Sequence, residues 1–206
     1  MTSPTPLLYD TYYHIYHRGR EREDIFMEER NYEFFLNLHF KYMEPVVETF
    51  AYCMLRNHYH MLVKVRPEKE IEEFLRFSET NKPLDAQYPG RKFSDFFNAY
   101  TKTINDARGR SGDLFQDSFG HVAVTADRQF WKVIACIHRN PQKHKLVKDF
   151  RDWKHSSYDV ILSDEPTKLK RDMVLEWFDG RDEYLKRHEK SFTDADSKWF
   201  AEHDAD

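Results

Sequence analysis

Cysteine is scarce in this chain: only Cys53 and Cys136 occur among its 206 residues. Two cysteines are too few for a disulfide framework, and because both lie in apolar segments they favour a reducing compartment. The sequence also has no run of about 18 apolar residues, the length that a transmembrane helix requires. Residues 1–6 lack the basic and then apolar order of a secretory signal. We therefore expect a cytoplasmic protein without a membrane partner.

An excess of positive charge is likewise missing, since the formal net charge is −4 at pH 7. This value argues against a generic nucleic-acid-binding protein, but the average hides an uneven distribution. Residues 101–155 hold 11 Lys or Arg against 6 Asp, a local excess of about five positive charges. Such a stretch can bind phosphate, or it can be an ordinary solvated face of the protein.

The pattern of apolar residues predicts strands and helices in alternation. Strands are expected at 11–17, 49–55, 58–65 and 121–125, and helices at 28–43, at 93–104 with Ser94 as N-cap, and at 127–140, where Pro141 disfavours continuation. The order β-α-β-β-α-β-α is that of the ferredoxin-like split βαβ fold, an α+β class with an antiparallel sheet and helices on one face. We divide the chain into a disordered N-terminus (1–10), this domain (11–147), a C-terminal helical extension (148–190) and an acidic, disordered tail (191–206).

Two histidines occupy alternate positions in the strand expected at residues 58–65. Because side chains alternate across a strand, His58 and His60 point to one face, while Tyr59, Met61 and Val63 form the core-facing row. The two imidazoles are then about 7 Å apart, close enough to share one cation. With 11 histidines in the chain, such a pair also arises readily by chance, so two ordinary strand histidines are the alternative. A metal site needs a third ligand from elsewhere.

The helix expected at residues 127–140 can supply that ligand. Cys136 and Asn140 are four residues apart and share one face of this helix. Asn140 offers an amide oxygen, and an oxygen ligand beside two imidazoles suits Mg²⁺, Mn²⁺ or another borderline cation. The alternative role for Asn140 is to end the helix as its C-cap ahead of Pro141.

Six segments of the chain carry a family resemblance. They are Arg56–Val63, Phe97–Asn105, Gly109–Gln116, Ile137–His144, Asp149–Tyr158 and Val174–Gly180, and the resemblance that they carry covers roughly residues 12–188. In this order they resemble the REP-associated tyrosine transposases, a branch of the single-tyrosine HUH transposases. One segment alone is weak evidence, whereas the series is specific.

The resemblance implies a ferredoxin-like nuclease fold in which the His-hydrophobic-His motif holds a divalent cation, Mg²⁺ or Mn²⁺. In this family a tyrosine hydroxyl attacks a phosphodiester of single-stranded DNA, leaving a 5′-phosphotyrosine and a free 3′-OH. The family motif has that tyrosine four residues before the Asn of Asn-Pro, which is the position of Cys136 in this chain. A thiol is several ångströms shorter than a phenol, and Cys136 also fits the role of a small, half-buried residue at a helix flank. The resemblance therefore predicts a transposase fold, metal site and DNA-binding surface, with phosphotyrosine chemistry impaired or lost.

Six basic residues of the central stretch are expected to contact DNA phosphates. They are Arg108, Arg110, Arg139, Lys143, Lys145 and Lys148. The expected partner is single-stranded or hairpin (palindromic) DNA, and a homodimer is possible. One alternative is an active metal-dependent endonuclease with a substitute nucleophile, for which the tyrosines considered are Tyr13, Tyr16, Tyr59 and Tyr100. The other is an RNA-binding or protein-interaction module in which the histidines are incidental.

Overall fold

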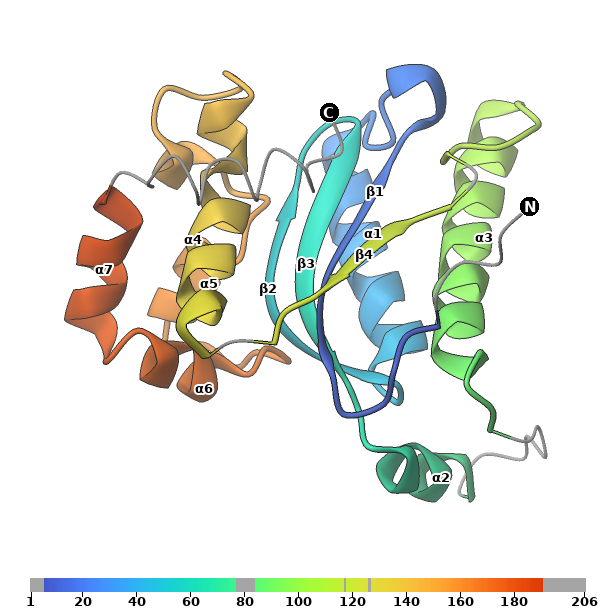
Figure 1. The fold of residues 1–206 in the computed structure, drawn as a ribbon. Helices are drawn as coiled ribbons and strands as arrows, with labels where there is room; N and C mark the ends of the chain where they lie inside the picture. Colours follow the sequence, from blue (N-terminus) through green and yellow to red (C-terminus); the bar gives the residue numbers. More distant parts are fainter. Residues whose placement is uncertain (1–5, 77–83, 117, 126, 191–206) are drawn as a thin grey trace.

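The computed structural model describes residues 6–76, 84–116, 118–125 and 127–190, which form one sheet with helices on both sides (Figure 1). The strands are β1 (Tyr12–Arg18), β2 (Val47–Met54), β3 (His58–Val65) and β4 (Gly120–Ala123). The helices are α1 (Glu29–Met43), α2 (Glu68–Arg76), α3 (Tyr88–Arg108), α4 (Asp127–Lys143), α5 (Tyr158–Leu162), α6 (Arg171–Trp177) and α7 (Arg181–Glu189). Two short 3₁₀ helices, η1 (Arg20–Arg22) and η2 (Phe150–Asp152), lie in the connecting segments.

The sheet has the strand order β2-β3-β1-β4, and each neighbouring pair is antiparallel. This order arises when two β-α-β units interleave, so that β1 and β3 become the central strands. The α+β class, the split βαβ arrangement and the C-terminal helices predicted above are confirmed. In the register of β1 and β3, Tyr16 lies opposite His60 and Arg18 opposite His58, so these four side chains share one face.

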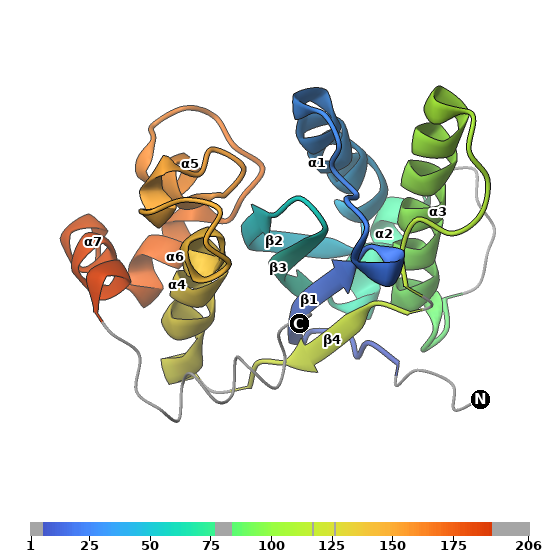
Figure 2. The same ribbon diagram turned by 90° about the horizontal axis from the view of Figure 1, so that it is seen from above.

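Helices cover both faces of the sheet, in contrast to the single covered face expected from the sequence. On one face Tyr59 packs against Phe35 of α1 and Phe97 of α3, with ring centroids 4.9 and 6.0 Å apart. On the other face lies α4, seen on the opposite side of the sheet from α1 and α3 in Figures 1 and 2. The physical reason is that β3 is apolar or buried in both of its rows: Leu62 is 0% exposed although it belongs to the histidine row.

Two helices extend beyond the ends that the sequence predicts. Helix α3 begins at Tyr88, so Ser94 lies inside the helix and bonds to the carbonyl of Gly90 instead of serving as N-cap. Pro89 falls in the first turn, where its fixed φ and missing N–H suit a helix start. Helix α4 continues through Pro141 to Lys143. Asn140 is therefore not a C-cap, and its carbonyl accepts from the backbone N–H of His144 at 2.9 Å.

The C-terminal extension packs against α4 and along the outer edge of β2. Trp153 donates its Nε1–H to the carbonyl of Met54 at 2.9 Å, and Tyr158 is buried. The backbone N–H groups of Ser157 and Lys170 donate to the carbonyls of Tyr52 and Thr49. Helices α6 and α7 are separated at Gly180, whose φ of 102° lies in a region that glycine adopts readily.

Most of the two segments predicted to be disordered falls outside the described residues, namely 1–5 and 191–206. Within 6–10, Leu7 is 2% exposed and belongs to the core. No helix in the described ranges combines the length and the apolar character that a membrane span requires.

Gly19 closes β1 and holds the turn that precedes β3, because its N–H donates to the carbonyl of Asn57 at 2.8 Å. A Cβ added at Gly19 would lie 2.1 Å from the carbonyl oxygen of Glu23, which is main chain and cannot rotate away. We expect Gly19→Ala to lower the free energy of unfolding by about 1–3 kcal/mol, the usual cost of overpacking. Gly90→Ala is the matched control, since nothing lies within 4 Å of its added Cβ and alanine is the better helix former. Urea denaturation of both variants checks this, and equal stabilities would contradict it.

Candidate functional site

The imidazole pair lies at the start of β3, on the face of the sheet that α4 covers. His58 and His60 are 2% and 1% exposed, and their ring centroids are 5.2 Å apart with planes at 88°. The Nδ1 atom of His58 bonds to Oδ1 of Asn57 at 2.7 Å, and Nδ1 of His60 bonds to Nε2 of His14 at 3.0 Å. The Nε2 atoms of His58 and His60 are both buried. Each ring thus engages its Nδ1 with a neighbour and directs Nε2 into the protein.

Helix α4 presents Cys136 and Asn140 in one row, and His144 continues that row by a further turn. The ring of His144 lies 4.8 Å from that of His58, so this row of the helix faces the imidazole pair. Asn140 is 8% exposed and Cys136 is half-buried. The structure therefore brings the C-terminal half of α4 to the same face of the sheet as His58 and His60.

The donor set at this face fits a divalent cation only when an oxygen ligand completes it. Among the described residues, no group of three or more His, Cys, Asp or Glu side chains is arranged to hold a metal ion. Two imidazole nitrogens and the amide oxygen of Asn140 would be a mixed set, in which the oxygen suits Mg²⁺ and Mn²⁺ and the imidazoles suit borderline transition metals. The engaged Nδ1 atoms also match the way metal-binding histidines are usually oriented.

The hydroxyls of the candidate substitute tyrosines are directed elsewhere. Tyr59 is fully buried on the opposite face, and Tyr100 on that face donates its hydroxyl to the carbonyl of Ile25 at 2.8 Å. Tyr13 shares the parity of Tyr59 in the sheet and accepts from the N–H of Leu8. Tyr16 is on the histidine face, but a Cβ on Gly120 would lie 2.1 Å from its ring. Its hydroxyl end therefore lies over β4, on the side of β1 away from β3.

The six basic residues fall into two groups, one at the C-terminal end of α3 and one at the C-terminal end of α4. Figure 1 shows both helix ends on the side of the sheet where β2 turns into β3. Arg108 is the last residue of α3 and Arg110 follows it, and they form ion pairs with Glu28 and Glu23 at 2.7 and 2.9 Å. The second group lies at the end of α4, on the other face of the sheet. It consists of Arg139, Lys143, Lys145 and Lys148, of which the three lysines are exposed.

A groove of about 430 Å³ lies near this end of the sheet, between the start of α1 and residues 147–155. Tyr32 and His155 stack in its wall with centroids 3.6 Å apart, and Trp153 also lines it. Its lining also includes three carboxylates and two basic residues, so the groove has aromatic surface without an excess of positive charge; they are Glu28, Glu29, Asp152, Arg56 and Lys154.

A buried polar network joins α7 to α4 and β2, which the sequence did not indicate. His138 bonds to Nε2 of His188 at 2.9 Å and to Oγ of Ser157 at 2.7 Å. At one end the N–H of Tyr52 must donate to Ser157, and at the other the carbonyl of Tyr184 must accept from Nδ1 of His188. The His188 end sets the protons of the two imidazoles: neutral His188 accepts at Nε2 from Nδ1–H of His138, and Nε2 of His138 then accepts from the hydroxyl of Ser157. The carbonyl of Tyr52, 3.2 Å from the same hydroxyl, is its second possible acceptor. We call these groups the His138–His188 network.

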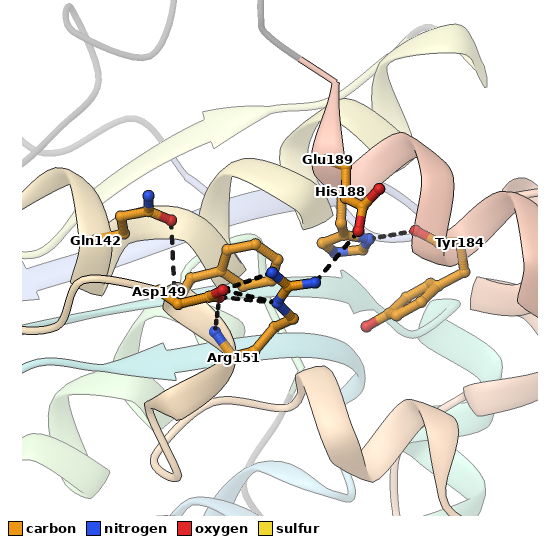
Figure 3. Close-up of polar contacts among 7 residues, drawn as sticks. Gln142, Asp149, Arg151, Tyr184, His188 and Glu189 are labelled. Atoms are coloured by element: carbon orange, nitrogen blue, oxygen red, sulfur yellow. Dashed lines mark hydrogen bonds and ion pairs between the residues drawn. The ribbon is translucent and has the colours of Figure 1, made fainter.

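Polar contacts around η2 tie the same elements together at the surface (Figure 3). Gln142 of α4 accepts from the N–H of Phe150 at 3.3 Å, and Arg151 pairs with Glu189 of α7 at 3.2 Å. Arg151 also bonds to Asp149 through two nitrogens, which lowers the pKa of that carboxyl to about 2. Figure 3 shows His188 and Tyr184 beside this group, so the network and the ion pairs hold one junction.

Two further histidines contact His58 and His60 and were not predicted from the sequence: His14 and His144. His14 was visible as a histidine of the first strand, but its approach to His60 depends on the register between β1 and β3. His144 extends the row of Cys136 and Asn140, a signal hidden by the expectation that the helix ends at Asn140.

The chain was compared with known proteins. No protein-family model matches it. It is 28% identical over 111 residues to a protein of Haemophilus influenzae that carries the provisional name REP-associated tyrosine transposase. That match covers 54% of this chain and 58% of the relative, so the similarity spans little more than half of either protein.

Among solved structures, a REP-associated tyrosine transposase bound to a REP hairpin has a TM-score of 0.56 and 18% sequence identity. The superposition covers 81% of this chain and 89% of that one. At this identity the likeness establishes the fold and nothing further. The resemblance of this chain to the REP-associated tyrosine transposases, drawn above from its motifs, is therefore confirmed in sequence over 111 residues and in fold over 81% of the chain.

Proposed function

We propose that this protein is a transposase-like protein that binds hairpin or single-stranded DNA, holds a divalent cation at His58, His60 and Asn140, and has impaired or lost phosphotyrosine chemistry. One observation carries the proposal: the imidazole pair is buried, and the ring of His58 lies 4.8 Å from that of His144, which follows α4 four residues after Asn140. Cys136, where the family has its nucleophile, lies four residues before Asn140. The solved relative bound to a REP hairpin supports hairpin DNA as the ligand class.

In this proposal the residues of the site have separate roles. Nε2 of His58, Nε2 of His60 and the amide oxygen of Asn140 would hold Mg²⁺ or Mn²⁺. When bound, such a cation polarises a scissile phosphate and stabilises the departing 3′-oxygen. Asn57 bonds to Nδ1 of His58 and His14 bonds to Nδ1 of His60, and these bonds orient the two ligand imidazoles. Cys136 offers a thiol that is too short to take the place of a phenol.

The two basic groups would bind the DNA backbone on either side of the β2–β3 turn. Lys143, Lys145 and Lys148 are exposed. Each contact between one of these lysines and a phosphate would release counterions that are condensed on the DNA, which favours binding at low salt. Arg108 and Arg110 are engaged with carboxylates, so their contact with phosphate requires exchange of those ion pairs. Trp153 and Tyr32 in the adjoining groove offer aromatic surface on which an unpaired base can stack.

A gel-shift titration with palindromic single strands tests the DNA-binding part. We expect replacement of Lys143, Lys145 and Lys148 by Ala to weaken binding and to reduce the slope of log affinity against log salt by about 2–3, near 0.7–0.9 for each phosphate contact. The matched control replaces Lys41, Lys69 and Arg76, three exposed basic residues on α1 and α2. No binding by the wild type at low salt would reject the proposal, and equal slopes for the two triple variants would reject the assigned surface.

The competing functions are separated by the same reagents. Incubation of labelled hairpin DNA with Mn²⁺ yields an adduct if a substitute tyrosine acts, and protein-free fragments if water acts, whereas intact DNA supports lost chemistry. Preference for RNA together with Mn²⁺ affinity unchanged by His58→Ala would favour the RNA-binding alternative. Tyr16 lies on the same face of the sheet as His58 and His60, and this observation favours the alternative in which a tyrosine replaces the missing nucleophile.

A further inference from the structure

His14 is not one of the three proposed cation ligands, yet it bonds to one of them, His60. Its Nε2 lies 3.0 Å from Nδ1 of His60, the ring planes are 18° apart, and the centroids are 5.1 Å apart. His14 is 3% exposed and lies in β1, next to the strand that carries His60. Two nitrogens at this separation share one proton, so one imidazole donates and the other accepts.

The position of that proton decides which nitrogen of His60 has a free lone pair. If Nδ1–H of His60 donates to His14, the proton is absent from Nε2 of His60, and Nε2 can bind a cation. If His14 donates instead, neutral His60 carries its proton on Nε2, and coordination through that atom is blocked. His58 meets the same requirement through Asn57, whose side-chain oxygen at 2.7 Å can only accept from Nδ1–H.

We infer that His14 is a positioning residue that holds His60 in the tautomer with Nε2 open, and so prepares the cation site. This inference rests on the proposed function, because it concerns the same cation. The two ligands of one strand are thus oriented by chemically different partners: an amide from the β2–β3 turn for His58, and an imidazole from the neighbouring strand for His60. Only the imidazole partner can itself change tautomer, so the preparation of His60 depends on His14.

Three variants and two measurements test the inference. His14→Phe keeps a ring of similar shape and removes the acceptor, whereas His14→Gln can return an acceptor oxygen near the place of Nε2. His39→Phe is the matched control, because His39 is 0% exposed and bonds to Thr49 on the other side of the sheet. Mn²⁺ affinity is measured by calorimetry on the full chain, and ¹⁵N NMR of the metal-free wild type assigns the tautomer of His60.

We expect the NMR spectrum to place the proton of His60 on Nδ1. We expect His14→Phe to weaken Mn²⁺ binding about 10–100-fold, the usual effect of losing an outer partner of a metal-bound histidine. His14→Gln should recover most of that loss, and His39→Phe should bind as the wild type does. A proton on Nε2 of His60, or an unchanged affinity in His14→Phe, would overturn the inference.

The outcomes separate this inference from the function on which it rests. If His58→Ala abolishes Mn²⁺ binding while His14→Phe leaves it unchanged, the cation site stands and the role of His14 falls. If the wild type binds no Mn²⁺, the proposed cation site is rejected, and the inference is rejected with it. Equal losses in His14→Phe and His39→Phe would point to loosening of the fold, and this too would overturn a specific role for His14.

Discussion

Replacing Cys136 by tyrosine is expected to give a covalent protein–DNA adduct that the wild-type protein does not form. The position lies one turn before Asn140 on the row of α4 that faces the imidazole pair, and it is half-buried. A phenol there extends farther toward that face than the thiol does. Loss of a nucleophile lowers rates by orders of magnitude, up to about 10⁶ in a serine protease, so its return should raise adduct formation at least about 100-fold.

The assay uses hairpin DNA labelled at either end, with Mn²⁺, followed by denaturing electrophoresis. A 5′-phosphotyrosine retains the fragment that carries the 3′ label, while the 5′-labelled fragment leaves with a free 3′-OH. Cys136→Phe supplies the ring without the hydroxyl and should form no adduct. Adding His58→Ala to Cys136→Tyr should abolish the product. A Cys136→Tyr protein that binds DNA and Mn²⁺ but stays inert would show that the site has lost more than its nucleophile.

His138→Leu is expected to lower the free energy of unfolding by about 2–4 kcal/mol at pH 7. His138 is 0% exposed, and its removal leaves Nε2 of His188 without its donor and restricts the hydroxyl of Ser157 to its longer bond with the carbonyl of Tyr52 at 3.2 Å. Each buried polar group left in this way costs about 1–3 kcal/mol. Urea denaturation measures the change. His39→Leu, which breaks the hydrogen bond between an equally buried histidine and Thr49, should cost about half as much.

The same substitution should flatten the dependence of stability on pH. Burial lowers the pKa of His138, and it lowers the pKa of His188 to about 4. Between pH 6.5 and 4 the unfolded chain therefore binds more protons than the folded protein does. Stability is fully present above pH 6.5 and is lost as the pH falls, by up to about 1.4 kcal/mol per pH unit for each such histidine. His138→Leu removes one of these groups, so a slope equal to that of the wild type would contradict the network.

The parts of the site that depend on local periodicity could be predicted from the sequence. The alternation around Tyr59 places His58 and His60 on one face, and the helical spacing places Cys136 and Asn140 on one row. The parts that depend on pairing between distant segments could not be predicted. His14 reaches His60 only through the register of β1 with β3, and the His138–His188 network joins residues from β2, α4, the segment before α5, and α7.

Helix ends were predicted less well because proline and glycine act differently at different positions. Pro89 and Gly90 suggest a loop when taken alone, yet in the first turn of α3 they lie where a missing N–H is harmless. Pro141 lies in the last turn of α4, where only one helical bond is lost and the chain can continue for two residues. The covering of both sheet faces followed from the second apolar row of β3, where Leu62 follows the histidines.

The docking of residues 155–157 and 169–170 on β2 limits how copies of this protein can associate. Backbone groups of Thr49, Tyr52 and Met54 on that strand already bond to these segments. An incoming strand finds its hydrogen-bonding positions there occupied, so the sheet cannot grow from one molecule into another along this border. A homodimer would consequently have to form through side-chain surfaces or at the four-residue strand β4, and accidental polymerisation through β2 is prevented by the protein's own C-terminal third.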